Sequence, residues 1–341
     1  MSQEGFNTQS SCGWGKTKKA TSSGGLSELK ELSNLGGSLE IGKLGHGKDD
    51  MVECKATNMT EKQHLQKLEL IWDFKWAEEI ECYDEKSLEG LQPHPNLKVL
   101  NLENYMGVRI PSCLSSLTNL VDLHMLHNER LQHLAPLNQL PFLKSVILQH
   151  MNALEYMLEE EDSVSNVFGG SSSSSSSSPK TPLFPSLSSL SILLCPNLKG
   201  WWRKDDDNEP DHPLSFPHLS YLSIFRCPNI TSLPQGICNL KSLQDLRIRD
   251  CPHLRERCQR QTGEDWPNIA HVTYVEVQWL NQQQETIPSS SGMHVSDFLI
   301  YRQTINYGCS SYAEPTAKQQ TWLAPNFKTL SLFGLFLFIL F

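Results

Sequence analysis

The stretch LSYLSIFRCPNITSLPQGICNLKSLQDLRIRDC, residues 219–251, carries the same short pattern twice. Leucine or isoleucine stands at positions one, four and six of each copy, which begin at Leu219 and, 24 residues later, at Leu243. A cysteine follows eight residues after the first leucine of both copies, at Cys227 and Cys251. Two features that return together at a fixed distance predict a structural repeat.

The pattern continues in both directions from this stretch. Its copies begin 23 to 44 residues apart, and the shorter spacings fall in the range of about 20–29 residues that is typical of leucine-rich repeats. The longer spacings require loops inserted into individual repeats. Eight copies are predicted, the last of them weaker, beginning at Leu65, Leu97, Leu120, Leu143, Leu187, Leu219, Leu243 and Ile269.

This spacing has a direct structural meaning. Side chains of a β-strand alternate between its two faces, so positions four and six point to the same face. One such unit cannot bury that face alone, whereas a stack of units joins the leucines into one continuous core. We therefore predict an α/β solenoid, a leucine-rich-repeat horseshoe with a parallel β-sheet on its concave face, irregular repeats and disordered termini.

Cysteine recurs just after three of the predicted strands. Cys195, Cys227 and Cys251 hold the same place in their repeats, and Asn128 holds it in another. A small polar group there can donate inward to backbone carbonyls, which predicts a structural role. A metal-binding ladder is the less favoured interpretation, because zinc sites usually show close C-x-x-C pairs and the sequence has none.

Composition divides the chain around the repeats. Residues 1–25 are rich in Ser, Gly, Thr and Lys and are predicted to be disordered, and the solenoid is placed at 26–280. A serine run from Ser171 to Ser178 lies in a disordered insertion predicted at about 159–182. Further insertions are expected at 72–96 and 201–213. An irregular polar segment, 281–326, and a short apolar tail, 327–341, follow the repeats.

The sequence shows no catalytic or cofactor motif, so we predict no enzyme activity, no cofactor and no metal. Gly15-Lys16-Thr17 resembles the end of a phosphate-binding loop, but Ser10 stands where that loop needs its first glycine. The net charge of −9 disfavours nucleic acid as a partner, since nucleic acid selects clustered Lys and Arg.

The two ends of the chain bear on its location. The first residues carry no apolar run behind a basic start, so no secretory signal is predicted, and ten scattered cysteines favour a reducing, cytoplasmic setting. The apolar run from Leu330 to Phe341 has 12 residues, and a bilayer-spanning helix takes about 20. Membrane attachment is therefore not expected.

Several stretches resemble the leucine-rich-repeat region of plant intracellular NB-LRR (NLR) disease-resistance proteins of the coiled-coil class. The most specific is SLEGLQPHPNLKVLNLENYMGVRIPSCL, residues 87–114, and LSELKELSNLGGSLEIGKL, residues 26–44, matches the entry into the repeats. The resemblance covers about residues 26–280. It departs at Ser112, where a tryptophan is usual, and in lacking the coiled-coil and nucleotide-binding regions that normally precede the repeats.

This resemblance implies a plant defence-related protein with a protein–protein recognition surface. Its partner would be a pathogen effector, a guarded host protein or the nucleotide-binding domain of an NLR. The chain would be a fragment or truncated paralogue of an immune receptor, without the nucleotide-binding switch. Two alternatives stay open: a secreted or cell-surface LRR binding or inhibitor protein, and an LRR substrate adaptor of a ubiquitin ligase.

Candidate binding residues follow from the alternation of the strands. Positions three, five and seven of each repeat face away from the leucine core, onto the concave surface. Aromatic and arginine side chains among them are the types that anchor interfaces. The candidates are Lys67, Glu69, Ile71, Asn101, Glu103, Asp122, His124, Tyr221, Phe225, Arg247 and Arg249.

Overall fold

A computed structural model describes most of the repeat region. The chain divides into two units, Met1–Thr286 and Ile287–Phe341, and every described residue lies in the first. The predicted insertion at 159–182, the polar segment 281–326 and the tail 327–341 lie outside the described residues, as does most of Gly15-Lys16-Thr17. The described ranges are 8–9, 17–21, 26–32, 34–73, 82–134, 140–158, 184–202, 216–234 and 236–278.

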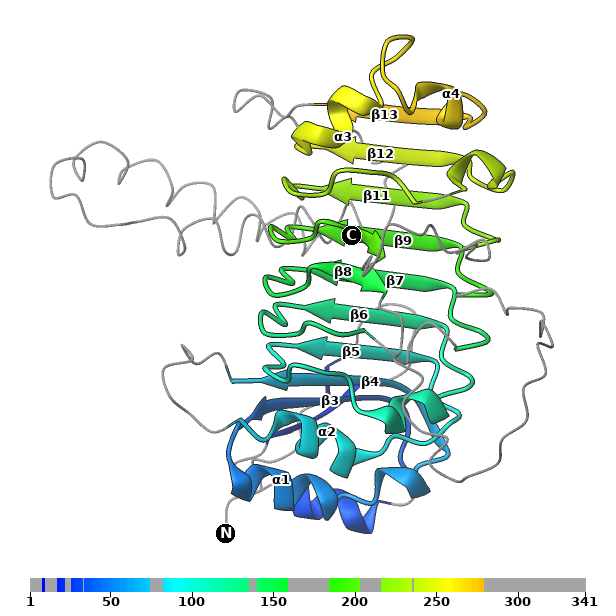
Figure 1. Ribbon diagram of the computed structural model, residues 1–341. Helices are drawn as coiled ribbons and strands as arrows, with labels where there is room; N and C mark the ends of the chain where they lie inside the picture. The colour runs from blue at the N-terminus through cyan, green and yellow to red at the C-terminus, as the bar shows by residue number, and fades with distance from the viewer. Residues whose placement is uncertain are drawn as a thin grey trace, which may run out of the picture. The chain divides into compact units, whose positions relative to one another are not determined.

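One sheet runs through the repeat region, as Figure 1 shows. Its parallel strands are hydrogen-bonded in chain order, apart from two short strands that form a sheet of their own, β8 (Tyr156–Leu158) and β10 (Gly200–Trp202). From β3 onward the parallel strands are β3 (Gly36–Leu44), β4 (His64–Trp72), β5 (Val99–Glu103), β6 (Asp122–Leu126), β7 (Ser145–Gln149), β9 (Ser189–Leu193), β11 (Tyr221–Phe225), β12 (Asp245–Arg249) and β13 (Tyr274–Gln278).

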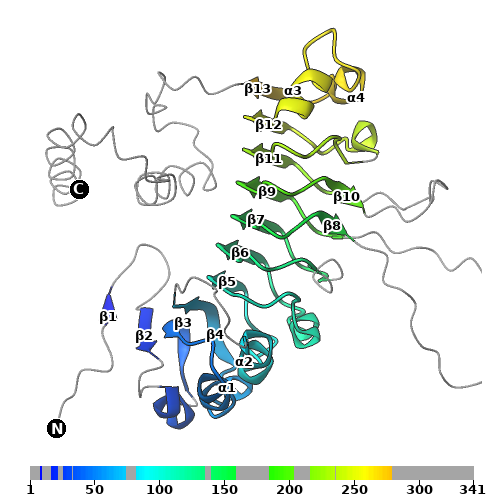
Figure 2. The ribbon, with the colours of Figure 1, turned by 60° about the vertical axis from the view of Figure 1, so that its left-hand side comes forward.

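The segments that return from one strand to the next pack on one side of this sheet (Figure 2). They carry the helices α1 (Lys48–Lys55), α2 (Asp84–Leu91), α3 (Pro252–Arg257) and α4 (Trp266–Ile269), and the 3-10 helices Leu26–Glu31, Met59–Glu61, Ser112–Ser116 and Ile237–Asn239. In the part of the chain that the structure describes, no helix is both long enough and apolar enough to cross a membrane.

The leucines of the pattern form the core between the sheet and these return segments. Leu100 pairs in register with Leu68 and Leu123, and all three are fully buried. The same register continues to Leu222 and Leu246, so the core is one cluster from the first repeat to the last. The predicted leucine-rich-repeat solenoid with a parallel sheet is therefore confirmed.

The last repeat differs from its predicted register. The sequence pattern was assigned to Ile269, Val272 and Tyr274, but Val275 and Val277 pair with the core residues of β12. The repeat therefore begins three residues later than predicted, at Val272. Tyr274 points away from the core as a result, and half of it is exposed.

The N-terminal 25 residues also depart from the expectation of disorder at two places. Short strands occur there, β1 (Thr8–Gln9) and β2 (Thr17–Thr21). The second pairs in parallel with β3, and the first pairs with the second in the antiparallel sense. Without β2, the edge of β3 would present unpaired backbone N–H and C=O groups, which favour the addition of a further strand.

The predicted inward hydrogen bonds after the strands are present. Asn128 accepts from the Tyr105 backbone N–H at 2.9 Å and donates to the Leu102 carbonyl at 3.3 Å. The cysteines act in a similar way through their thiols: all three donate to a carbonyl of their own repeat, and Cys227 and Cys251 also donate to one of the repeat before. Cys195 donates to Leu193 at 3.4 Å, Cys227 to Ile192 at 3.8 Å, and Cys251 to Ile224 at 3.7 Å.

A charge in the core should unfold the stack. Leu222→Asp buries an unpaired carboxylate among leucines, and we expect a loss of at least about 3 kcal/mol in the free energy of unfolding. Urea titration followed by circular dichroism measures it. The control is His218→Asp, at an exposed position of the same repeat, which should cost less than about 1 kcal/mol. Equal losses in the two variants would contradict the core assignment.

Candidate functional site

The side of the sheet that faces away from the core is the candidate site. We call it the front face; it consists of the strand side chains that alternate with the buried leucines. Figure 2 shows the described helices on the opposite side. The strand register lines up the front-face residues of successive repeats in three rows, one of which runs through Glu69, Asn101, His124, Ile147 and Ser191.

The N-terminal end of the front face is acidic. Glu40 lies directly opposite Glu69 on the neighbouring strand, and Lys67 forms an ion pair with Glu69 at 3.2 Å. Burial raises the pKa of Glu103, and the charges of Glu69 and Glu40 raise it further. Carboxylates are thus gathered here against their mutual repulsion, which makes this end suited to a cationic partner surface.

Three histidines follow, His124 on β6 and His127 and His150 just after β6 and β7, and they are uncharged at neutral pH. Burial, with Lys67 nearby, lowers the pKa of His124 to about 4. His127 stacks on His150 with ring centroids 4.3 Å apart. Burial and the neighbouring His150 lower the pKa of His127 to about 4. The acidic end therefore gains no compensating positive charge from these rings.

The centre of the front face is neutral, with small and apolar side chains. Ser191 and Ser223 lie side by side in the row that continues from His124 and Ile147. Leu193 pairs in register with Phe225 on the next strand. Ile147, Leu193 and Phe225 are buried without belonging to the leucine core cluster. These residues form an apolar strip between the two charged ends.

The C-terminal end is built around Arg247. Its guanidinium lies over the rings of Tyr221 and Tyr274, at 5.5 Å from each centroid. Two guanidinium nitrogens donate to Asp245, at 3.0 and 2.9 Å. The register places these residues on three adjacent strands, β11, β12 and β13. We call Tyr221, Asp245, Arg247 and Tyr274 the arginine cluster; two rings and a carboxylate hold its arginine in one orientation.

Two further ion pairs flank the arginine cluster. Arg249 donates to both carboxylate oxygens of Glu276, at 2.7 and 2.8 Å. Burial alone would raise the pKa of Glu276, but the hydrogen bonds and charge of Arg249 hold it below the ordinary value. Arg226 lies 3.3 Å from Asp250 and 5.0 Å from the Phe225 ring centroid. Charge at this end is therefore paired within the protein.

The structure places all the predicted candidates on strands of the sheet, in the alternating positions expected. It separates them into two groups: the acidic end holds Lys67, Glu69, Ile71, Asn101, Glu103, Asp122 and His124, and the C-terminal end holds Tyr221, Phe225, Arg247 and Arg249. Sequence reasoning missed Tyr274 and Glu276, because the last repeat was assigned to the wrong register. The overlapping pattern Val272, Val275, Val277 was the signal that could have found them.

The repeats match two known families. Residues 26–151 match the family described as R13L1/DRL21 LRRs. Residues 94–252 match the family described as leucine-rich repeats of plant disease resistance protein RPS2-like type. The predicted resemblance to the leucine-rich-repeat region of plant NLR disease-resistance proteins is confirmed.

Individual relatives carry disease-resistance names. Putative disease resistance protein RGA4 of Solanum bulbocastanum is 34% identical over 187 residues, which cover 54% of this chain and 17% of that protein. Disease resistance protein RGA2 of the same species is 26% identical over 273 residues, 77% of this chain and 25% of that protein. The chain thus spans a quarter or less of the length of these two relatives.

A solved structure of an internalin from Listeria monocytogenes aligns with 77% of this chain and 81% of its own. The sequence identity is 14% and the TM-score is 0.28. The strand register and the continuous leucine core define the fold of this chain.

Removing the charge of Glu103 should stabilise the protein at neutral pH. Its pKa is raised in the folded state, so ionisation penalises folding above that pKa, and the penalty disappears as the pH falls through it. Glu103→Gln should gain about 0.5 kcal/mol at pH 7 and nothing below the ordinary glutamate pKa of 4.5.

Urea titrations of Glu103→Gln at several pH values check this expectation. The control is Glu256→Gln on the exposed side of α3, which should leave stability unchanged at every pH. A loss of stability in Glu103→Gln at pH 7 would show that the carboxylate has a favourable partner and would overturn the repulsion described here.

Proposed function

We propose that this chain, whose leucine-rich repeats are those of plant disease-resistance proteins, binds a protein partner through the front face of its sheet. Its role is recognition in plant defence, with no catalytic step. The partner is a pathogen effector, a guarded host protein or the nucleotide-binding domain of an NLR. The relatives named above support the defence setting, and the geometry of the front face supports the mode of binding.

The arginine cluster is the observation that carries this proposal. Arginine and tyrosine contribute most to binding energy at protein interfaces, especially in the well-packed centre of a contact. Arg247 is already fixed by Tyr221, Tyr274 and Asp245, so little side-chain entropy is lost when a partner binds. Tyr274 is half exposed, so a partner can reach the cluster from the solvent.

The proposal places the protein in the cytoplasm. Cys195, Cys227 and Cys251 are free thiols that donate to backbone carbonyls in the repeats. A reducing compartment keeps them in this form. An oxidising compartment would favour their conversion to disulfides, which would remove these hydrogen bonds.

Photo-crosslinking tests the front face directly. A benzophenone amino acid replaces Tyr274 in one preparation and Phe142 in another; Phe142 is also half exposed but lies between strands, outside the front face. Both are incubated with an extract of infected leaf tissue, irradiated and examined by mass spectrometry. We expect the probe at position 274 to form an adduct with one specific protein. The probe at position 142 should form no adduct with that protein. Adducts shared equally by both positions would contradict the proposal.

The partner found in this way then serves as the probe for affinity. Arg247→Ala and Tyr274→Ala should each weaken binding by about 2 kcal/mol, since they remove the anchoring side chain or one wall that holds it. Phe142→Ala should bind like the unaltered protein. Unchanged affinity in both cluster variants would show that binding does not use this end of the front face.

A further inference from the structure

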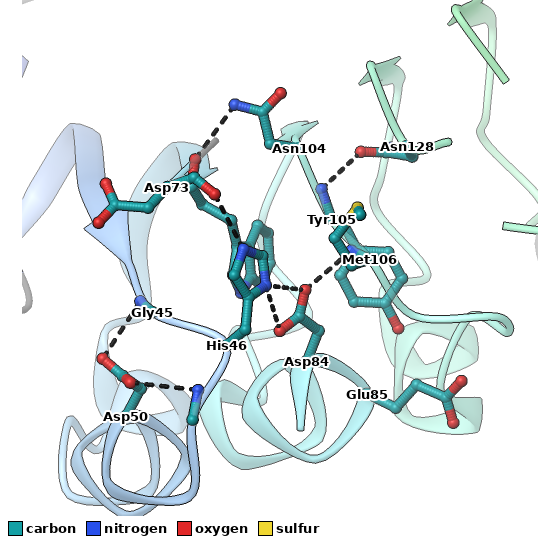
Figure 3. A network of polar contacts seen from close by, with 12 residues as sticks. Gly45, His46, Asp50, Asp73, Asp84, Glu85, Asn104, Tyr105, Met106 and Asn128 are labelled. Atoms are coloured by element: carbon teal, nitrogen blue, oxygen red, sulfur yellow. Dashed lines mark hydrogen bonds and ion pairs between the residues drawn. The ribbon is translucent and has the colours of Figure 1, made fainter. Parts of the chain in front are cut away.

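A buried histidine lies between the residue that follows β4 and the first residue of α2. His46 follows β3 and is 6% exposed. Its Nε2 lies 2.8 Å from the backbone carbonyl of Asp73. Its Nδ1 lies 2.9 Å from each carboxylate oxygen of Asp84, the first residue of α2. Figure 3 shows the ring between these two partners.

The carbonyl fixes which ring nitrogen carries hydrogen. A carbonyl oxygen can only accept, so Nε2 must be the donor to Asp73. In a neutral ring Nδ1 would then present a lone pair to the Asp84 carboxylate, which is also an acceptor. Two acceptors at 2.9 Å repel each other, so a positive charge has to lie between them. That charge is a proton or a metal ion.

A third ligand group lies beside this pair. Cys82 is two residues before Asp84, and one ligand atom each from His46, Cys82 and Asp84 falls within 4.8 Å of the others. His46 and Asp84 are buried and Cys82 is half-buried. Imidazole nitrogen, thiolate and carboxylate oxygen are the three ligand types that Zn²⁺ takes in proteins. We propose that His46 Nδ1, Cys82 Sγ and Asp84 form a zinc site, with water in the fourth position.

The surroundings of these residues are those of a metal centre. A zinc-binding histidine usually donates its other N–H to a carbonyl or carboxylate, which orients the ring, and Asp73 supplies that carbonyl. Asp84 also accepts from the Met106 backbone N–H at 2.8 Å, which fixes its carboxylate. Two of the three ligands, His46 and Asp84, are therefore held in place before any ion arrives.

Zinc at this place would join two parts of the chain directly and a third through Asp84. His46 belongs to the turn from β3 to α1, and Cys82 and Asp84 to the start of α2; Met106 follows β5. The Asp73 carbonyl, directly after β4, orients the His46 ring. The ion would therefore tie the first repeats together, which gives it a structural role at the acidic end of the solenoid.

Metal uptake is a balanced exchange with protons. In the metal-free protein a proton lies between His46 Nδ1 and the Asp84 carboxylate, because Nε2 already donates to the Asp73 carbonyl. Zn²⁺ displaces that proton and the thiol proton of Cys82, and no bond changes its oxidation state. Two protons are released for each ion bound.

Metal titration of the untagged, reduced full chain tests the site. After chelator treatment we expect one Zn²⁺ per chain by calorimetry, and a thiolate-to-cobalt charge-transfer band when Co²⁺ is the probe. Cys82→Ser should lose that band and weaken Zn²⁺ binding at least about tenfold. The control is Cys113→Ser, another half-buried free cysteine outside the cluster, which should keep both the band and the affinity.

Asp84→Asn separates metal binding from folding. The amide oxygen can still accept from Met106, while the charge that attracts the metal is gone; we expect weaker Zn²⁺ binding in a chain with unchanged circular dichroism. Absence of stoichiometric Zn²⁺ in the unaltered chain, or equal affinity in Cys82→Ser, would overturn the proposal and leave the proton as the bridging charge. Neither result bears on binding by the front face.

Discussion

The structure depends on one constraint: a single repeat cannot bury its own leucines. Each strand offers two or three apolar side chains to the core, and they lose contact with water only when the neighbouring repeats stack on both sides. The shared register of Leu68, Leu100 and Leu123 is the direct result. The buried backbone groups impose the same requirement, since Asn128, Cys227 and Cys251 each donate to a carbonyl of the preceding repeat. Burial and hydrogen bonding thus both tie the repeats to their neighbours. The same stacking aligns the side chains of the front face in rows.

The core could be predicted from the sequence because it depends on spacing alone. Positions four and six identify the buried leucines wherever the pattern is clear, and their alternation identifies the front face. The prediction was wrong where two patterns overlap: Ile269, Val272 and Tyr274 compete with Val272, Val275 and Val277, and only pairing with β12 decides between them. The backbone conformation of the turn after a strand also depends on pairing with the next strand. Leu194 and Arg226 have φ values of 55° and 50°, which residues with such side chains rarely adopt. Their backbone N–H groups donate hydrogen bonds to the next strand, which holds them in this conformation.

The polar groups of the candidate sites could be predicted less well, because their chemistry comes from contacts between distant residues. The sequence identified Arg247 as a surface side chain, but its two flanking rings come from β11 and β13. His46 and Asp84 are 38 residues apart and meet only because the return segments after β3 and β4 lie next to each other. The chemistry of the front face changes along the repeats, from the acidic N-terminal end through the apolar centre to the arginine cluster. A partner that contacts several repeats at once could use all three of these regions.

Residue-resolved amide hydrogen exchange on the full chain tests whether the repeats form one continuous sheet ending at β13. We expect slow exchange at the strand amides from β4 to β12, with similar free energies of opening. We also expect protection of Asp250, whose N–H donates to the Gln278 carbonyl at 3.1 Å only in the register described. Protection confined to separate groups of strands, or rapid exchange at Asp250 beside a protected β12, would contradict the continuous sheet.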